Sequence, residues 1–203
     1  MPPRRARIPD DDQIRSLHRR HAPTGAAFAL VYQHSQIVWQ IAGQLLARRR
    51  HRLDRDLVRA GSLLHDVGVY RLYGPTGGID HDQYVRHGVA GHELLQELGW
   101  PERICRFCSH HTGMGLSRED VAAQRLPIPV ADYLADTEEE ELVMYADKFH
   151  SKTTPPAFVS VESCLATLRP FGQDKVERFT ALRAKFGDPD LPPLISDHGH
   201  PLT

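Results

Sequence analysis

Apolar residues recur every three or four positions along most of this chain, which is the spacing of an amphipathic helix. Val31, Val38, Ile41 and Leu45 form one such stripe, and His34 shares their face. Capping residues, glycines and prolines separate the stripes. We therefore predict helices over about residues 10–20, 26–50 (or from 31), 54–67, 82–98, 101–111, 138–150, 157–168 and 174–186.

The segments between these helices show no clear strand pattern, so the predicted fold class is all-α. At 203 residues the chain fits one domain with terminal extensions. We predict an N-terminal helix and linker over residues 1–25 and a helical domain over residues 26–186. Residues 187–203 hold four prolines and little periodicity, and we expect a C-terminal tail there. The glycine-rich stretch between Tyr70 and His81 lacks the P-loop pattern, which favours a connector or a flexible lid.

The most informative motif is His65-Asp66, which stands where an apolar helix is expected to end. A carboxylate buried there without a partner would be costly, so a positive group should neutralise it. Adjacent imidazole and carboxylate groups can both point at one metal ion. Other helices carry His34, His87 and His111 within apolar stripes, where each inward-pointing ring needs a partner. One shared metal would satisfy them all.

A second carboxylate would complete such a site, and the last part of the helix over residues 138–150 offers a choice. Asp147 lies at the edge of the apolar face, whereas His150 lies nearer its centre. Spacing alone does not decide between them. His110 points away from His111 on an ideal helix, so it could be a ligand only if the helix ended there.

Simpler interpretations compete with a metal site. Any one buried histidine is most often a hydrogen-bonded core residue, so the argument depends on several occurring together. Cys105 and Cys108 have the spacing of a zinc-binding pair, but a structural zinc site usually needs four ligands and no second cysteine pair exists. Two small core residues are the better interpretation of this pair.

Composition narrows the range of partners. The net charge of −1 gives no global attraction to nucleic acid or to an anionic membrane. No apolar run approaches the roughly 20 residues that cross a bilayer, so we expect no membrane partner. Three cysteines, an odd number, argue against a disulfide framework and favour a cytoplasmic location. Thirteen histidines are many for this length, and histidine is the commonest metal ligand.

An ordered series of side chains resembles that of the HD superfamily of metal-dependent phosphohydrolases: His34, His65, Asp66, His87, His111 and Asp147. The resemblance covers roughly residues 31–150. Three strings resemble the HDIG-type branch of that superfamily: YVRHGVAGHELL (84–95), HTGMGLS (111–117) and EEEELVMYADK (138–148). The turn after His111 lacks the acidic and Gly-Tyr-Pro residues of the cyclic-di-GMP phosphodiesterase branch, so we do not expect that substrate.

This resemblance implies an HD-domain helical bundle over residues 26–186, and it selects Asp147 over His150 as a ligand. It further implies one metal held by His34, His65, Asp66 and Asp147. Asp66 would bridge to a second metal that His87 and His111 reach. We therefore expect two transition-metal ions; mixed nitrogen and oxygen donors fit iron, manganese, zinc, cobalt or nickel without selecting one.

The predicted function is hydrolysis of a phosphate ester of a nucleotide or another small phosphorylated metabolite by metal-activated hydroxide. Asp66 is expected to act at the reacting centre. Lys148 and Arg86 stand next to predicted ligands and would offset developing charge, although either could equally be an ordinary surface cation. His110 would protonate the leaving oxygen.

Two other function classes remain open from the sequence. One is a non-catalytic HD domain that binds a nucleotide and signals through a partner, and the intact ligand set argues against it. The other, less favoured, is a di-iron oxygenase of the HD type. The expected partner is a small phosphorylated substrate, with no nucleic acid and no membrane, and the sequence leaves homo-oligomerisation open.

Overall fold

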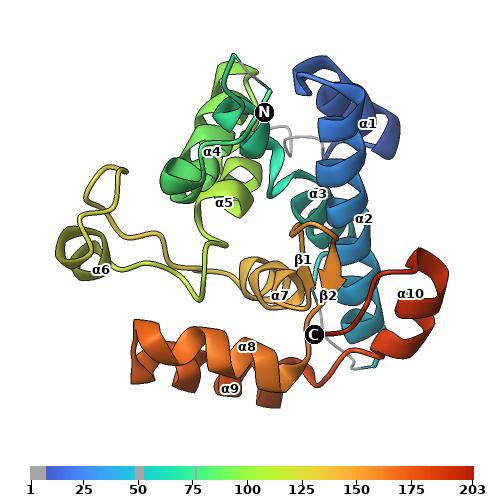
Figure 1. The fold of residues 1–203 in the computed structure, drawn as a ribbon, viewed down its shortest axis with the longest axis vertical. Coiled ribbons are helices and arrows are strands. Elements are labelled where there is room, and N and C mark those ends of the chain that lie inside the picture. The colour runs from blue at the N-terminus through green and yellow to red at the C-terminus, as the bar shows by residue number, and fades with distance from the viewer. Residues whose placement is uncertain (1–7, 49–52, 76) are drawn as a thin grey trace, which may run out of the picture.

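The computed structural model of this protein describes residues 8–48, 53–75 and 77–203, and helices dominate it (Figure 1). The helices are α1 (Asp11–His21), α2 (Gly25–Arg48), α3 (Arg55–Leu64), α4 (His87–Glu97), α5 (Glu102–Ser109), α6 (Arg118–Ala123), α7 (Glu138–Asp147), α8 (Val161–Leu168), α9 (Gln173–Phe186) and α10 (Leu191–His198). In these described ranges, three short 3-10 helices and two strands complete the elements: η1 (Val67–Leu72), η2 (His81–Arg86), η3 (Arg169–Phe171), β1 (His150–Ser151) and β2 (Ala157–Phe158). The predicted all-α class is confirmed.

Capping side chains begin several helices where the sequence places them. Asp54 accepts hydrogen bonds from two backbone N–H groups in the first turn of α3. Ser117 and Asp120 form a reciprocal capping box at α6, and Thr137 caps α7. Because the first N–H groups of a helix have no partner within it, these side chains fix where each helix starts.

Helix α7 runs through the middle of the molecule, where it contacts α2, α3, α5 and α9 (Figure 1). Two buried apolar clusters share the interior. One packs α7 against α8, α9, α10 and the second half of α2; the other packs α1, α3, α4 and α5 around the first half of α2. His34 lies on α2 between Val31 of the second cluster and Ile37 of the first. The candidate ligand His34 therefore lies where the two clusters meet.

Two glycines let the chain after α3 press against α4 and α5. A Cβ atom on Gly68 would lie 2.0 Å from the backbone oxygen of His87 and 2.3 Å from the backbone nitrogen of Gly91. A Cβ atom on Gly91 would lie 3.0 Å from that of Cys108. Side chains at these positions would push the segments apart. The glycines thus bring together the end of α3, the start of α4 and the end of α5.

The C-terminal segment differs from the aperiodic tail that its prolines led us to expect. Leu191–His198 form α10, and the apolar side chains of Leu191 and Leu194 join the core. Its two prolines lie in the first turn, which tolerates proline because those N–H groups have no helical partner. The last three residues then run beside β2. The domain boundaries themselves remain a prediction.

Other differences lie at the ends of elements. The helix predicted to reach His150 ends at Asp147, and His150 begins β1, which pairs antiparallel with β2. Two-residue strands carry too little periodicity to be predicted. The helix expected from residue 82 begins at His87, after η2. Arg49 and Arg50, at the end of the helix predicted over 26–50, lie outside the described residues.

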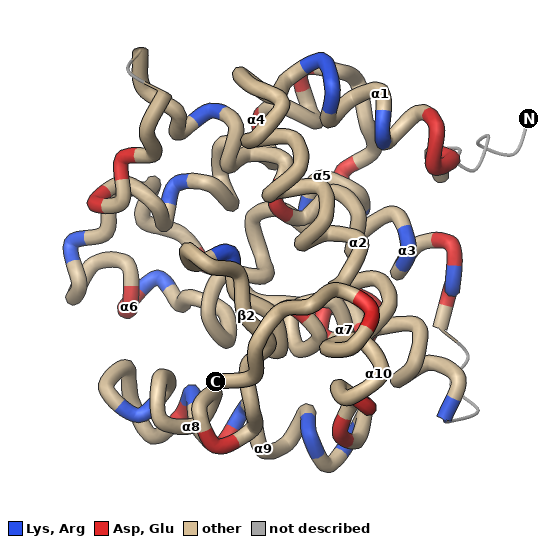
Figure 2. Tube along the Cα trace, turned by 45° about the vertical axis from the view of Figure 1, so that its right-hand side comes forward, with Lys and Arg blue, Asp and Glu red and all other residues tan. Residues whose placement is uncertain are grey.

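Charged residues of both signs alternate around the part of the molecule that the structure describes (Figure 2). Basic and acidic positions occur together on α1, α3 and α9. Among the described residues, no helix combines the length and apolar character needed to cross a membrane.

Candidate metal centre

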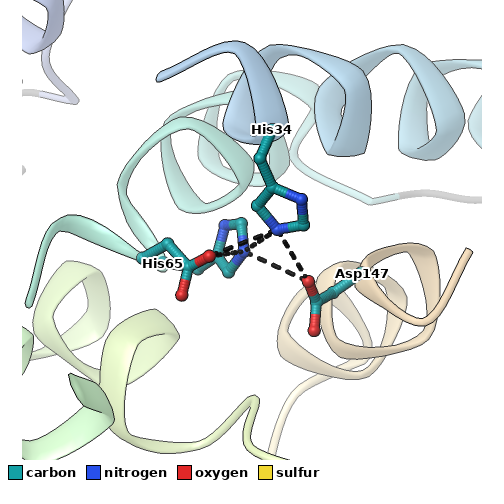
Figure 3. A group of neighbouring side chains, drawn as sticks. His34, His65 and Asp147 are labelled. Carbon is teal, nitrogen blue, oxygen red and sulfur yellow. Dashed lines mark hydrogen bonds and ion pairs between the residues drawn. The ribbon is translucent and has the colours of Figure 1, made fainter. Parts of the chain in front are cut away.

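The first group of converging side chains comes from positions far apart in the sequence: His34, His65, Asp66 and Asp147. Their potential ligand atoms all lie within 4.8 Å of one another. Nε2 of His34 lies 3.0 Å from Oδ1 of Asp147 and 3.2 Å from Oδ2 of Asp66. Nε2 of His65 lies 3.4 Å from each of the same two oxygens. Figure 3 shows His34 from α2, His65 from the end of α3 and Asp147 from α7 directed toward one another.

Asp66 also belongs to a second group, with His87 at the start of α4 and His111 just after α5. The Nε2 atoms of the two histidines lie 3.0 Å apart. They lie 3.5 Å and 3.6 Å, respectively, from Oδ1 of Asp66. The structure thus brings all six predicted ligands together, in two groups that share one aspartate.

The Asp66 carboxylate faces both groups because each of its oxygens serves one of them. Oδ2 lies beside His34 and His65, and Oδ1 lies between His87 and His111. The side chain is 1% exposed, yet Oδ1 has no hydrogen-bond partner among the described residues. An unpartnered buried carboxylate oxygen is costly, and a metal ion would satisfy it. The donor set therefore fits metal binding on both sides of Asp66.

Hydrogen bonds behind the rings turn each Nε2 toward the site. The Nδ1–H groups of three rings donate to backbone carbonyl oxygens: His65 to Ser62 at 2.7 Å, His87 to Tyr84 at 2.6 Å and His111 to Phe107 at 2.9 Å. In a neutral ring this leaves the Nε2 lone pair free, as a metal ligand requires. Nδ1 of His34 instead lies 2.8 Å from Nδ1 of His150.

The electrostatics of the site show how strongly it attracts positive charge. Burial lowers the pKa of His65, but Asp66 and Asp147 outweigh it and raise that pKa to about 9. Although burial opposes ionisation of both carboxyls, neighbouring cations hold their pKa values well below the usual range. Burial lowers the pKa of His87 to about 3, which keeps this ring neutral and able to bind a metal.

A cavity of about 440 Å³ adjoins the centre, and Asp66, His87, His111 and Asp147 form part of its wall. Three cations, Lys148, Lys152 and Lys175, also line it. Much of the remaining wall is apolar: Val85, Met114, Leu116, Leu126, Leu168 and Phe171. A second cavity of about 450 Å³ shares Tyr84, Asp147, Lys148 and Lys152 with the first. Lys148 and Lys152 therefore line both cavities beside the donors.

The structure does not bring two of the predicted catalytic residues to this cavity. Nδ1 of His110 lies 2.6 Å from the hydroxyl oxygen of Ser109, and neither cavity includes His110. Arg86 is exposed and also lines neither cavity. Lys148 does line both cavities, and its ammonium lies 2.7 Å from Oδ2 of Asp147.

Sequence reasoning missed Lys152 and Tyr84. Lys152 is hydrogen-bonded to Oδ2 of Asp66, and the Tyr84 ring centroid lies 4.8 Å from that of His87. Burial raises the pKa of Tyr84 to about 12, so it keeps its hydroxyl proton. Lys152 follows the end of α7 by five residues, where no helical periodicity predicts its direction. Tyr84 begins the segment over residues 84–95 that resembles the HDIG-type branch, three residues before His87. This short separation from a predicted ligand could have indicated a place near the site.

Comparison with protein families shows which family the chain belongs to. The model of the HD domain family matches residues 31–152, a range that contains all six converging ligands. The chain belongs to the HD domain family. This confirms the predicted superfamily, whereas the HDIG-type branch remains a prediction.

Two relatives show how much of the chain recurs elsewhere. A tRNA (cytidine(56)-2'-O)-methyltransferase of Picrophilus torridus is 35% identical over 144 residues, which are 71% of this chain and 37% of that protein. An uncharacterised protein of Methanocaldococcus jannaschii is 36% identical over 120 residues, which are 58% of this chain and 64% of that protein. The chain thus spans less than two thirds of the length of either relative.

Solved structures share the fold. The HD domain of the L. monocytogenes phosphodiesterase PgpH, in complex with cyclic-di-AMP, matches with a TM-score of 0.54 and 16% identity over 91% of this chain and 96% of that one. A second crystal structure of the same domain matches with a TM-score of 0.53 and 15% identity, over 92% and 99% of the two chains. At this identity the likeness shows the fold alone, and it confirms the HD-domain helical architecture.

Proposed function

We propose that this HD domain is a metal-dependent phosphohydrolase that cleaves a phosphate ester of a nucleotide or another small phosphorylated metabolite. One observation carries the proposal. The two oxygens of Asp66 face two separate groups of donors, beside a cavity whose wall includes Lys148 and Lys152. This arrangement suits two metal ions that share Asp66 and a phosphate group next to them. His34, His65 and Asp147 would hold one ion, and His87 and His111 the other.

Bound there, divalent ions would acidify a water molecule and polarise a phosphoryl oxygen. The chain's own residues would bind and orient the substrate. Lys148 and Lys152 line both cavities and would offset the negative charge of the phosphate. The fixed Nδ1 hydrogen bonds hold the ligand rings in place before the substrate arrives. His110 and Arg86 have no part in this proposal, because neither lines either of the two cavities beside the centre.

The apolar wall of the first cavity favours a substrate with an aromatic or apolar group beside its phosphate. Met114, Leu126 and Phe171 lie in that wall, in the same cavity as Lys148 and Lys152. The PgpH domain binds cyclic-di-AMP, which is built from nucleotides, and this supports a nucleotide among the candidate substrates. The donor set remains compatible with iron, manganese, zinc, cobalt or nickel.

The test uses the full chain, purified without a chelating tag and loaded separately with Mn²⁺, Co²⁺ and Ni²⁺. It is assayed with p-nitrophenyl phosphate, bis(p-nitrophenyl) phosphate and a panel of nucleotides and cyclic dinucleotides. We expect metal-dependent hydrolysis that EDTA and Asp66→Ala abolish. Asp56→Ala, which removes an exposed carboxylate of α3, should keep the activity.

Metal-loaded protein that binds a nucleotide but hydrolyses none of these compounds would contradict the proposal and favour the signalling domain. Oxygen consumption by the reduced iron form, without hydrolysis, would favour the oxygenase instead.

A further inference from the structure

His34 differs from the other candidate ligands in what supports its ring. The other three histidines of the centre place Nδ1 on a backbone carbonyl. Nδ1 of His34 lies 2.8 Å from Nδ1 of His150, and Nε2 of His150 lies 2.9 Å from Nδ1 of His200. Three imidazoles thus form a continuous hydrogen-bonded series from the centre to the fourth residue from the end of the sequence.

We propose that His150 and His200 position His34 for metal binding, so that the C-terminal segment completes the metal centre. The proposal rests on the proposed metal centre but not on the reaction that it catalyses. His150 and His200 are positioning residues, because they act on the ion only through His34.

The reason is the direction of the hydrogen bonds. To bind a metal through Nε2, a neutral His34 must carry its proton on Nδ1 and donate it to His150. A carbonyl oxygen can only accept, but an imidazole nitrogen can either donate or accept. Nδ1 of His150 accepts only when the proton of that ring is on Nε2. His200 selects this tautomer by accepting the Nε2–H of His150 through its own Nδ1.

Packing holds the series in place. His34 and His150 are buried, and the ring of Phe158 meets His150 edge-on at 5.1 Å between centroids. The rings of His150 and His200 stack at 5.1 Å, with 27° between their planes. Both contacts restrict the orientation of the His150 ring, which links His34 to His200.

The backbone of the C-terminal residues fixes the position of His200. Phe158 of β2 donates its N–H to Pro201 O at 2.8 Å and accepts the N–H of Thr203 at 2.9 Å. Ser160 donates its N–H to Thr203 O at 2.8 Å. The end of the chain therefore lies along β2 as an added strand-like segment, and it presents His200 to His150.

The test measures Co²⁺ binding to metal-free full chain by titration against a competing chelator, with the visible spectrum of bound Co²⁺ as a second readout. Loss of a hydrogen bond behind a metal ligand typically weakens affinity by about 10–100-fold. We expect His200→Ala to weaken the binding of one of the two Co²⁺ ions by this factor. The visible spectrum of the bound Co²⁺ should change as well. The ion bound by His87 and His111 should keep its affinity.

Two matched variants separate hydrogen bonding from general damage. His198→Ala removes a neighbouring histidine that bonds to Gln40 at 2.7 Å and stands outside the series, so it should bind Co²⁺ as the wild type does. His200→Asn keeps an acceptor at the place of Nδ1 and should restore most of the affinity. Wild-type affinity in His200→Ala, or an Asn variant as weak as the Ala variant, would overturn the proposal.

A measurement without substitutions gives a second test. In the Zn²⁺-loaded wild type, ¹⁵N NMR of the histidine rings should find the proton of His34 on Nδ1 and those of His150 and His200 on Nε2. A proton on Nδ1 of His150 would overturn the proposal. Normal metal binding without hydrolysis would contradict the proposed function alone.

Discussion

Lys152 donates a hydrogen bond to the Asp66 carboxylate across 86 positions of sequence. The oxygen that it contacts is the one beside His34 and His65, so the ammonium lies against the first group of donors. A buried carboxylate needs such a cation, and the same cation would attract a phosphate group in the cavity.

Replacing Lys152 by Met should separate metal binding from turnover. Removing a cation beside the centre cannot weaken its attraction for a divalent ion, so Co²⁺ affinity should stay the same or rise. Loss of a charge that stabilises the transition state should lower kcat by about 10²–10³-fold. Lys185→Met, at a cation that pairs with surface glutamates, should change neither quantity. Loss of bound metal in Lys152→Met would contradict this role.

Turnover should not depend on His110 or Arg86. Neither residue lines either of the two cavities beside the centre, so His110→Ala and Arg86→Ala should keep their metal content and kcat to within about threefold, the scatter expected of a change away from the site. Lys148→Met should lower kcat, because it removes a cation that lines both cavities. Steady-state kinetics of the three variants with one metal and one substrate make the comparison. A large loss in His110→Ala with normal metal content would restore its predicted acid role.

Much of the site could be predicted because helical periodicity marks inward-facing histidines. His34, His87 and His111 each lie in an apolar stripe, and the structure buries all three. Periodicity failed where the helix stopped. It could not decide between Asp147 and His150, because it assumed one helix through both, whereas α7 ends at Asp147. The family resemblance selected Asp147, and the structure places that carboxylate among the converging donors.

What the sequence hid lies in segments without a repeating pattern. Lys152 contacts Asp66 and His200 contacts His150, and the segments that carry them, after β1 and at the chain end, depend on backbone pairing with β2. The prolines of residues 187–203 suggested a tail, but two of them lie in the first turn of α10, where proline costs no hydrogen bond. Contacts of this kind become visible only once the distant segments are folded together.

Gly68 should tolerate no side chain. In Gly68→Ala the added methyl group would overlap the backbone of His87 and Gly91, and the free energy of unfolding should fall by about 1–3 kcal/mol or more. Gly43→Ala is the matched control, because its nearest neighbour would be a Trp39 ring atom at 4.0 Å within a helix, and alanine there should stabilise by up to about 1 kcal/mol. Urea denaturation of both variants gives the two values. Equal stabilities would contradict the close packing of η1 on α4.

His18 should make stability depend on pH. Its buried ring lies 2.8 Å from the Tyr70 hydroxyl and 2.7 Å from Leu63 O, and burial lowers its pKa to about 4 from the usual 6.5. Between these values the unfolded chain binds the proton and the folded chain does not. Its contribution to the free energy of unfolding is therefore complete above pH 6.5 and is lost as the pH falls toward 4.

The measurement for His18 is urea denaturation across that pH range for the wild type and His18→Gln. The free energy of unfolding should rise with pH more steeply in the wild type than in His18→Gln, by up to about 1.4 kcal/mol per pH unit. His81→Gln, at an exposed histidine, should follow the wild-type curve. Parallel curves for wild type and His18→Gln would show that His18 binds its proton equally in both states.

Elemental analysis of protein purified without a chelating tag tests the central claim most directly, because it counts the ions that the convergent donors hold. We predict two transition-metal ions per wild-type chain and a loss of bound metal in Asp66→Ala, since that carboxylate serves both groups of donors. A wild type that binds no such ion, or an Asp66→Ala variant with full metal occupancy, would contradict the account.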